Sequence, residues 1–172
     1  MNINDLKHTV LVAIGVTIIS GCAAFTPSNK GLAAIEEQRI AIVEQIDKSQ
    51  NWQTNEVLLH YSVNNSAQSF SITGTLKIAD RIIGSFPFSE YFNLYLTFVD
   101  DSGTGLSTHS IGPLFIYRGE VPDTLEFTKT LIKPEGAVAY TFSYDGSFLG
   151  DVGQGGGGAD WQISFRPFSK TR

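Results

Sequence analysis

The chain has 172 residues and a formal net charge of −5, with 42% hydrophobic and 17% charged residues. This length suits one domain with accessory segments, and the apolar content excludes a chain that is disordered throughout. The mildly acidic balance, without any run of Lys and Arg, excludes the clustered positive charge with which proteins bind nucleic acid.

An apolar stretch near the start of the chain, residues 9–19, predicts an export signal. It is too short to cross a bilayer of about 30 Å, because a spanning helix needs about 20 residues. The polar lead before it is weakly charged, since Asp5 opposes Lys7. Directly after it come Ile19, Ser20, Gly21 and Cys22.

These four residues resemble the lipobox of bacterial lipoproteins, in which an apolar residue and two small residues precede a cysteine. The resemblance implies that residues 1–21 are a signal peptide cut between Gly21 and Cys22. Cys22 would then carry acyl chains such as palmitate, because its thiolate is the nucleophile for thioether formation. Two or three such chains hold a protein stably on a membrane.

Two alternatives for this segment stay open. Cys22 could be a free thiol in a secreted protein cut after Ala24, or the apolar stretch could remain as a membrane anchor. The chain has no second cysteine with which Cys22 could pair, which favours lipidation. Ala23 differs from the Asp that retains lipoproteins at the inner membrane, so the resemblance implies the outer membrane, at its periplasmic face or at the cell surface.

The next two segments are predicted to be a tether and a helix. Residues 22–31 contain Pro27, Asn29 and Gly31, which discourage regular structure, so we expect a lipid-anchored tether. Residues 32–50 lack Gly and Pro and predict an amphipathic helix. Such a helix could pack on its own domain or dock on a partner. Its apolar stripe consists of Leu32, Ile35, Ile42 and Ile46.

From residue 56 onward the apolar period changes from helical to two, which predicts strands with one buried face. The clearest runs are residues 70–78 and 92–98. Short strands separated by turn residues indicate that residues 56–172 form a mainly β domain, an antiparallel β-sandwich of about eight strands, immunoglobulin- or transthyretin-like, with a barrel as the main alternative. The other strands are expected at residues 57–63, 106–110, 114–117, 125–131, 138–144 and 161–165, with one of the turns at Asp145-Gly146.

A glycine-rich stretch, residues 150–160, is predicted to be a flexible loop between the last two strands. At the end of a sandwich it could also serve as a binding loop. A calcium site would require Asp145, Asp151 and Asp160 to converge there, although the single G-G-x-G-x-D copy lacks the stacked turns of calcium-binding repeats. The candidate binding loop comprises Phe148, Asp151, Gly155, Gly156, Gly157, Gly158, Asp160 and Trp161.

Catalytic and metal-binding patterns are weak. His60 and His109 are the histidines that follow the signal segment, too few for a zinc site of His/Cys type. Ser107 and His109 share one face of a predicted strand and are the basis for a hydrolase hypothesis, but the sequence around them lacks the nucleophile-elbow pattern. We therefore expect no catalytic residues, no metal and no cofactor.

The favoured function is a non-catalytic binding or accessory module for another envelope protein or assembly, held to the membrane by lipid. Its physical basis would be an open sheet edge or a loop end. The alternative is a small-ligand or glycan-binding sandwich. It would use the glycine-rich loop and an exposed face of aromatic rings from Tyr91, Tyr95, Tyr117, Tyr140, Tyr144 and Trp161.

Overall fold

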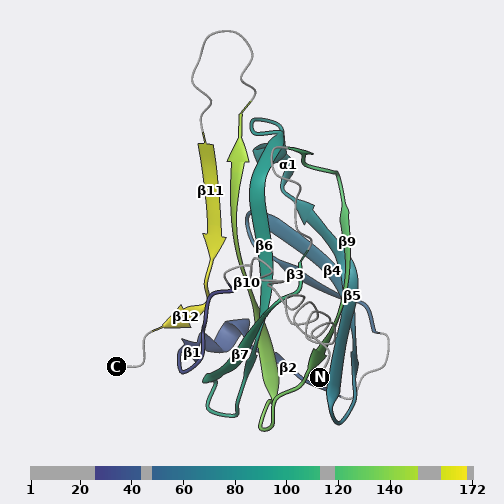
Figure 1. Cartoon of the computed structure of the whole chain (residues 1–172), viewed down its shortest axis with the longest axis vertical. Helices are drawn as coiled ribbons and strands as arrows, with labels where there is room; N and C mark the ends of the chain where they lie inside the picture. Colours follow the sequence, from purple (N-terminus) through teal and green to yellow (C-terminus); the bar gives the residue numbers. More distant parts are fainter. Residues whose placement is uncertain (1–25, 44–47, 113–118, 151–159, 170–172) are drawn as a thin grey trace, which may run out of the picture.

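The computed structural model describes residues 26–43, 48–112, 119–150 and 160–169. Its architecture is two antiparallel β-sheets (Figure 1). One sheet has the order β3-β4-β5-β9, comprising β3 (Gln50–Gln53), β4 (Val57–Asn65), β5 (Ser69–Ile78) and β9 (Leu125–Ile132). The other has the order β11-β10-β6-β7, comprising β11 (Asp160–Phe165), β10 (Ala139–Leu149), β6 (Phe88–Val99) and β7 (Gly105–Ser110).

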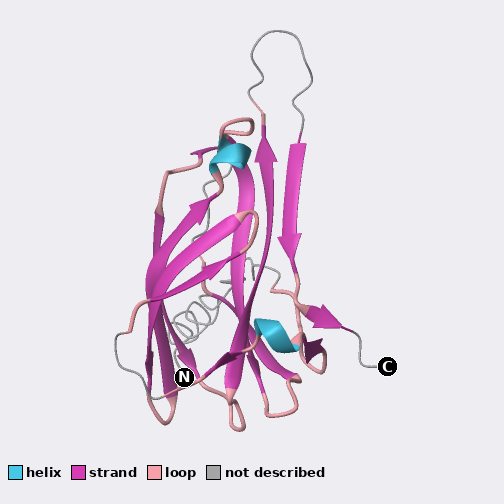
Figure 2. Ribbon diagram, turned by 180° about the vertical axis from the view of Figure 1, so that it is seen from behind, coloured by secondary structure: helices cyan, strands magenta, loops and turns pink. Residues whose placement is uncertain are grey.

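These eight strands form two separate, facing sheets in the described part of the chain (Figure 2). The prediction of a mainly β, antiparallel sandwich of about eight strands is therefore confirmed. Short elements complete the fold: β1 (Ala33–Ala34) paired with β12 (Phe168–Ser169), β2 (Ile40–Ala41) paired with β10, β8 (Gly119–Glu120) paired with β6, the 3-10 helix η2 (Glu36–Gln38) and the helix α1 (Asp80–Ile83).

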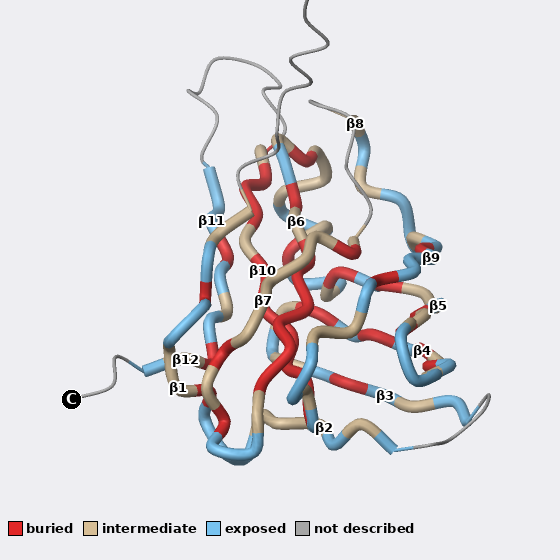
Figure 3. The backbone as a smooth tube through the Cα atoms, turned by 60° about the horizontal axis from the view of Figure 1, so that its bottom comes forward, coloured by how far each residue is buried: buried red, intermediate tan, exposed pale blue. Residues whose placement is uncertain are grey.

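The core lies between the sheets and follows from the alternation of apolar residues. On β6, Phe92, Leu94, Leu96 and Phe98 are buried in the core that both sheets share. Figure 3 shows buried backbone along β6. Aromatic rings fill the space between the layers with tilted and edge-on contacts, the geometry that ring quadrupoles favour. These contacts include Trp52 with Phe142, Phe70 with Phe98, and Tyr61 with Phe142.

The helix predicted over residues 32–50 is wrong in the described residues, which form β1, η2 and β2 instead. Tertiary hydrogen bonds take the backbone groups that a helix would use: Ala34 N–H donates to Gly103 O, and the Arg39 guanidinium donates to Ala34 O. Ile42 N–H donates to Val138 O. Helix propensity is a weak preference that such contacts override. Residues 44–47 lie outside the described residues.

The segment predicted as a tether is partly attached to the sandwich. Asn29 is buried, and its side-chain amide donates a 3.1 Å hydrogen bond to Thr97 Oγ1, while its backbone N–H donates to Thr108 Oγ1 at 3.2 Å. Gly31 N–H donates to Gly105 O. Asn29 and Gly31 therefore belong to the sandwich, and the segment without such contacts is shorter than the predicted tether of residues 22–31.

Two further details differ from the sequence expectations. Strand β3 forms where the end of the predicted helix and a connection were expected. Asp145 and Gly146, predicted as a turn, lie inside β10, opposite Asn93 and Phe92 of β6. A turn signal is overridden here because both neighbouring strands continue to pair with β10. The strand expected at residues 114–117 lies outside the described residues.

Candidate functional site

A hollow of about 540 Å³ opens between the β3–β4 turn and β11. We call it the polar hollow, because five of its six lining residues carry hydrogen-bonding side chains. It lies on the side of the sandwich where β3 and β11 are the edge strands of their sheets. Its lining residues are Gln38, Gln53, Thr54, Asn55, Glu56 and Phe165.

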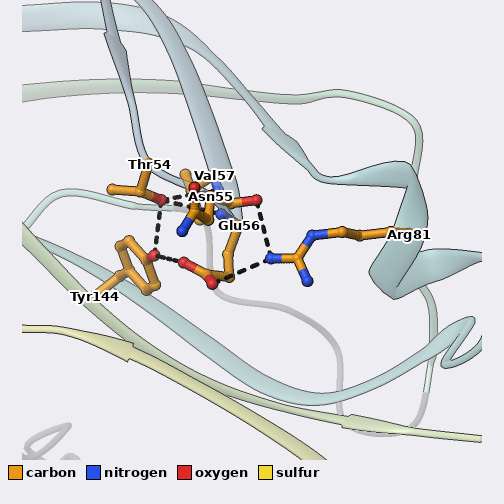
Figure 4. Close-up of polar contacts among 6 residues, drawn as sticks. All are labelled: Thr54, Asn55, Glu56, Val57, Arg81 and Tyr144. Carbon is orange, nitrogen blue, oxygen red and sulfur yellow. Dashed lines mark hydrogen bonds and ion pairs between the residues drawn. The ribbon is translucent and has the colours of Figure 1, made fainter.

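A hydrogen-bond network at the hollow joins the two sheets (Figure 4). The Tyr144 phenol of β10 donates to Glu56 Oε2 at 2.7 Å and lies 2.8 Å from Thr54 Oγ1. Thr54 Oγ1 accepts the backbone N–H groups of Glu56 and Val57, which fixes the turn between β3 and β4. Because Tyr144 gives its proton to Glu56, the Thr54 hydroxyl donates to the phenol oxygen.

Arg81 of α1 completes this network on its solvent side. Its guanidinium donates to Glu56 Oε1 and to the Asn55 carbonyl, each at 3.2 Å. Both ionic side chains remain partly exposed, at 56% for Arg81 and 27% for Glu56, so the ion pair contributes at most about 1 kcal/mol. Its main effect is to hold the Glu56 carboxylate in place against Tyr144.

The chemistry of this network is that of a structural tie. Burial raises the pKa of Tyr144; the Thr54 hydrogen bond lowers it, and the Glu56 hydrogen bond and charge raise it. The phenol therefore stays neutral at physiological pH, and each carboxylate oxygen of Glu56 accepts one hydrogen bond from within the fold.

The carboxamide side chains that line the polar hollow differ from Tyr144 and Glu56, which are held by hydrogen bonds within the fold. The side chains of Gln38, Gln53 and Asn55 have no hydrogen-bond partner among the residues that the structure describes. Each carboxamide offers two donors and an acceptor, which matches both the N–H and the C=O of a peptide backbone. The ring of Phe165 provides an apolar wall beside them.

Ser107 and His109, the candidate hydrolase pair, do meet on β7. Ser107 Oγ lies 3.0 Å from His109 Nε2. Burial lowers the pKa of His109, and the nearby Lys129 lowers it further. In the described residues no acidic group hydrogen-bonds to the second ring nitrogen of His109, so the orienting third member of a catalytic triad is missing there.

The aromatic residues of the glycan-binding alternative do not gather on one face. Tyr95, Tyr140 and Tyr144 are buried, and Tyr117 lies outside the described residues. Tyr91 and Trp161 are exposed, but they point to opposite faces of the sheet. Tyr91 pairs with Ser147, Trp161 pairs with Phe148, and successive residues of a strand alternate in direction. Trp161 packs on Phe86 instead.

The candidate binding loop is described only at its two ends. Phe148 is fully buried in the core, where it contacts Phe92, so it cannot serve as an exposed loop residue. Asp160 and Trp161 begin β11. Asp151 and Gly155, Gly156, Gly157 and Gly158 lie outside the described residues, as do Gly21 and Cys22.

The register of β10 and β11 separates the acids of the calcium hypothesis. Asp160 lies opposite Leu149, four residues along β10 from Asp145, which corresponds to about 13 Å. Among the described residues no group of three His, Cys, Asp or Glu side chains could hold a metal ion. Asp145 instead accepts a hydrogen bond from the Asn93 amide. The described helices also include none that is long and apolar enough to span a membrane.

No protein-family model matches this chain, and comparison with curated proteins and solved structures also found no match.

The residues of the polar hollow were missed by sequence reasoning. Thr54, Asn55 and Glu56 stand between the apolar residues Trp52 and Val57, and this polar break is a usable turn signal. Their partners Arg81 and Tyr144 carry no local signal, because the fold brings them there from 25 and 88 residues away from Glu56.

Proposed function

We propose that this chain is a lipid-anchored binding module of the bacterial cell envelope, which engages an extended segment of another envelope protein through the polar hollow. Its role is accessory and non-catalytic. The observation that carries the proposal is the set of carboxamides of Gln38, Gln53 and Asn55, which line the hollow and have no partner in the described residues.

The neighbouring groups support binding over catalysis. Glu56 is the one acidic group among the described residues that line the hollow, and it is held by Tyr144 and Arg81. A general acid or base needs a site within hydrogen-bond reach of a reacting proton. The free carboxamides, in contrast, match backbone amides, which every extended peptide presents. Phe165 would contact its apolar side chains.

The experiment is site-specific photocrosslinking in living cells. A photoreactive phenylalanine analogue replaces Leu58, an exposed residue that lies opposite Gln53 and leaves the three carboxamides in place. A matched control carries it at Thr128, an exposed residue of β9 at the other edge of its sheet. We expect one protein adduct from position 58 and none from position 128. Adducts of equal yield at both positions, or none at position 58, would contradict the proposal.

The proposed anchor also fixes how close the domain sits to the membrane. Residues 22–28 are the stretch available between lipidated Cys22 and buried Asn29. Seven residues span at most about 25 Å when fully extended. The domain would therefore stay at the surface of the outer membrane, and the polar hollow would meet partners there.

Intact mass spectrometry tests the anchor. Protein extracted from membranes is expected to lack residues 1–21 and to carry acyl mass on Cys22, whereas Cys22→Ser protein keeps its signal segment and gains no acyl mass. A free thiol at Cys22 in the wild-type protein would refute the lipid anchor. The binding proposal would then be tested by the photocrosslinking experiment alone.

A further inference from the structure

Strand β11 is an open edge of its sheet. It pairs with β10 on one side, and on its other side the described residues offer no backbone partner. Figure 3 shows it at the margin of the molecule, with mostly exposed residues. Edge strands of this kind pair readily with another strand unless something protects them.

The other long edge strands are protected. On β9, Lys129 pairs with Ile72, which faces the core, so a charged side chain points inward at that edge. On β7, the first residues are covered, since Gly31 N–H donates to Gly105 O and Gly105 N–H donates to Leu32 O. Neither kind of protection is found on β11 in the described residues. This strand has no Pro, no inward-facing charge and no register shift against β10.

The sequence of β11 is complementary to itself in one antiparallel register. Trp161, Ile163 and Phe165 face the interior of the sandwich, and the alternate residues face outward. When a second copy runs antiparallel with Ile163 opposite Ile163, Asp160 lies opposite Arg166 at each end. Trp161 then lies opposite Phe165, and Gln162 opposite Ser164.

We infer that two copies of this chain pair through β11 in this register. The four-stranded paths β11-β10-β6-β7 of the two copies would join into one continuous sheet of eight strands. Asp160 and Arg166 are both exposed, and neither makes an ion pair within the described residues. The dimer gives each of them an opposite charge directly across the strand pair, where charge pairs are stabilising.

The charges of Asp160 and Arg166 favour the register centred on Ile163 over the adjacent register centred on Gln162. Centring the pair on Gln162 would set Asp160 opposite Ser164 and leave Arg166 beyond the paired residues. The aromatic residues favour the same choice. Trp161, which is 45% exposed, would be covered by Phe165 of the second copy, an aromatic cross-strand pair.

The dimer also places its two polar hollows close together. Phe165 lines the hollow and lies two residues from the two-fold axis at Ile163. The two Phe165 residues are then about 13 Å apart along the strand direction. The inference does not depend on what the hollow binds, but paired hollows would increase the avidity for a partner with two binding segments.

Charge reversal tests the inference on the full-length protein in detergent, with the mass measured by sedimentation velocity over a concentration series. Wild-type protein is expected to be a dimer. Asp160→Arg and Arg166→Asp each set like charges opposite one another, and each should weaken the dimer at least about tenfold. The double variant Asp160→Arg/Arg166→Asp restores opposite charges and should restore the dimer.

Glu126→Arg is the matched control, because it makes the same kind of charge change on the exposed face of β9. It should leave the dimer intact. Circular dichroism confirms that each variant is folded. A monomeric wild-type protein at every concentration, equal loss of dimer in the control, or a double variant that stays monomeric would overturn the inference.

Cysteine crosslinking gives a second, independent measurement in a Cys22→Ser background. Gln162→Cys of one chain would lie opposite Ser164→Cys of the other, at a Cα separation of about 4.5 to 5.5 Å that suits a disulfide. Mixing the two variants should produce a linked dimer on oxidation, whereas each variant alone should not. Absence of the linked dimer in the mixture would contradict the register.

Discussion

The phenol of Tyr144 on β10 donates a 2.7 Å hydrogen bond to Glu56 Oε2 at the β3–β4 turn, and so ties one sheet of the sandwich to the other. This bond and the contact with Thr54 are made where the core ends and the polar hollow begins. The Tyr144–Glu56 hydrogen bond therefore has a structural role, because it helps to set the shape of the hollow.

Replacing Tyr144 with Phe should destabilise the domain by about 1 to 3 kcal/mol. The substitution removes both hydrogen bonds of the phenol and leaves a partly buried carboxylate oxygen without its donor. Urea unfolding followed by tryptophan fluorescence measures the change. Tyr91→Phe is the control, since Tyr91 is exposed; an equal loss in both variants would contradict the role of the network.

Stability should fall in alkaline solution because of the buried tyrosines. Burial raises the pKa of Tyr140 above its ordinary 10.0, and Tyr61 raises it further through its charge and its hydrogen bond. The folded state then holds the phenolic proton more tightly than the unfolded chain does. The stabilisation is complete below pH 10.0 and is lost as the pH rises above that value.

The measurement for Tyr140 is the free energy of unfolding at several values between about pH 8 and about pH 11. We expect a decline above about pH 10, and a shallower decline for Tyr140→Phe. Identical slopes for the variant and the wild type would show that Tyr140 ionises equally in both states, against the burial seen in the fold.

Substituting Gly105 by Ala should release the segment that begins at Asn29. A Cβ at position 105 would collide with the carbonyl of Asn29, which packs directly against this glycine. The amides of Gly31 and Ala34, which donate to Gly105 O and Gly103 O, should then exchange with solvent at least about tenfold faster. Hydrogen exchange detects this change.

Ser107→Ala, two residues further along β7, is the control for Gly105→Ala. It removes the hydroxyl that contacts His109 and leaves the contacts of residues 29–34 in place. Unchanged protection of Gly31 in Gly105→Ala would mean that the segment can move aside without losing its hydrogen bonds.

Lys129→Gln should raise the pKa of His109. Burial is the main cause of the lowered pKa of this imidazole, and the positive charge of Lys129 adds to it. Removing that charge leaves the burial effect, so the pKa should move part of the way towards the ordinary 6.5. NMR titration of the ring resonances measures the shift, and Lys77→Gln should leave it unchanged.

Local periodicity predicted the strands because each alternating run needs only its own residues to define a buried face. Phe92, Leu94, Leu96 and Phe98 carry that pattern, and all four are buried. The contact between Ser107 and His109 was predictable for the same reason, since residues two apart on a strand share a face. These features depend on spacing alone.

The predicted helix failed because residues 32–43 are bound by distant parts of the chain. Ala34 N–H donates to Gly103 O in the β6–β7 turn, and Ile42 N–H donates to Val138 O just before β10. Distant parts of the chain thus supply the acceptors that a helix would have supplied internally. The turn expected at Asp145-Gly146 failed similarly, because β6 and β11 continue to pair on both sides of it. Local propensities of about 1 kcal/mol or less cannot outweigh such pairing.

Sequence alone therefore determined the class of fold, its strand periodicity and the hypothesis of a lipid anchor at Cys22, because each rests on residues close together in the chain. The tertiary structure decided the polar hollow and the open edge at β11. Glu56 meets Tyr144 across 88 residues, and β11 is left at an edge because β10 is the one described strand that pairs with it. Strand order is set by the packing of the whole chain, and no short stretch of residues encodes it.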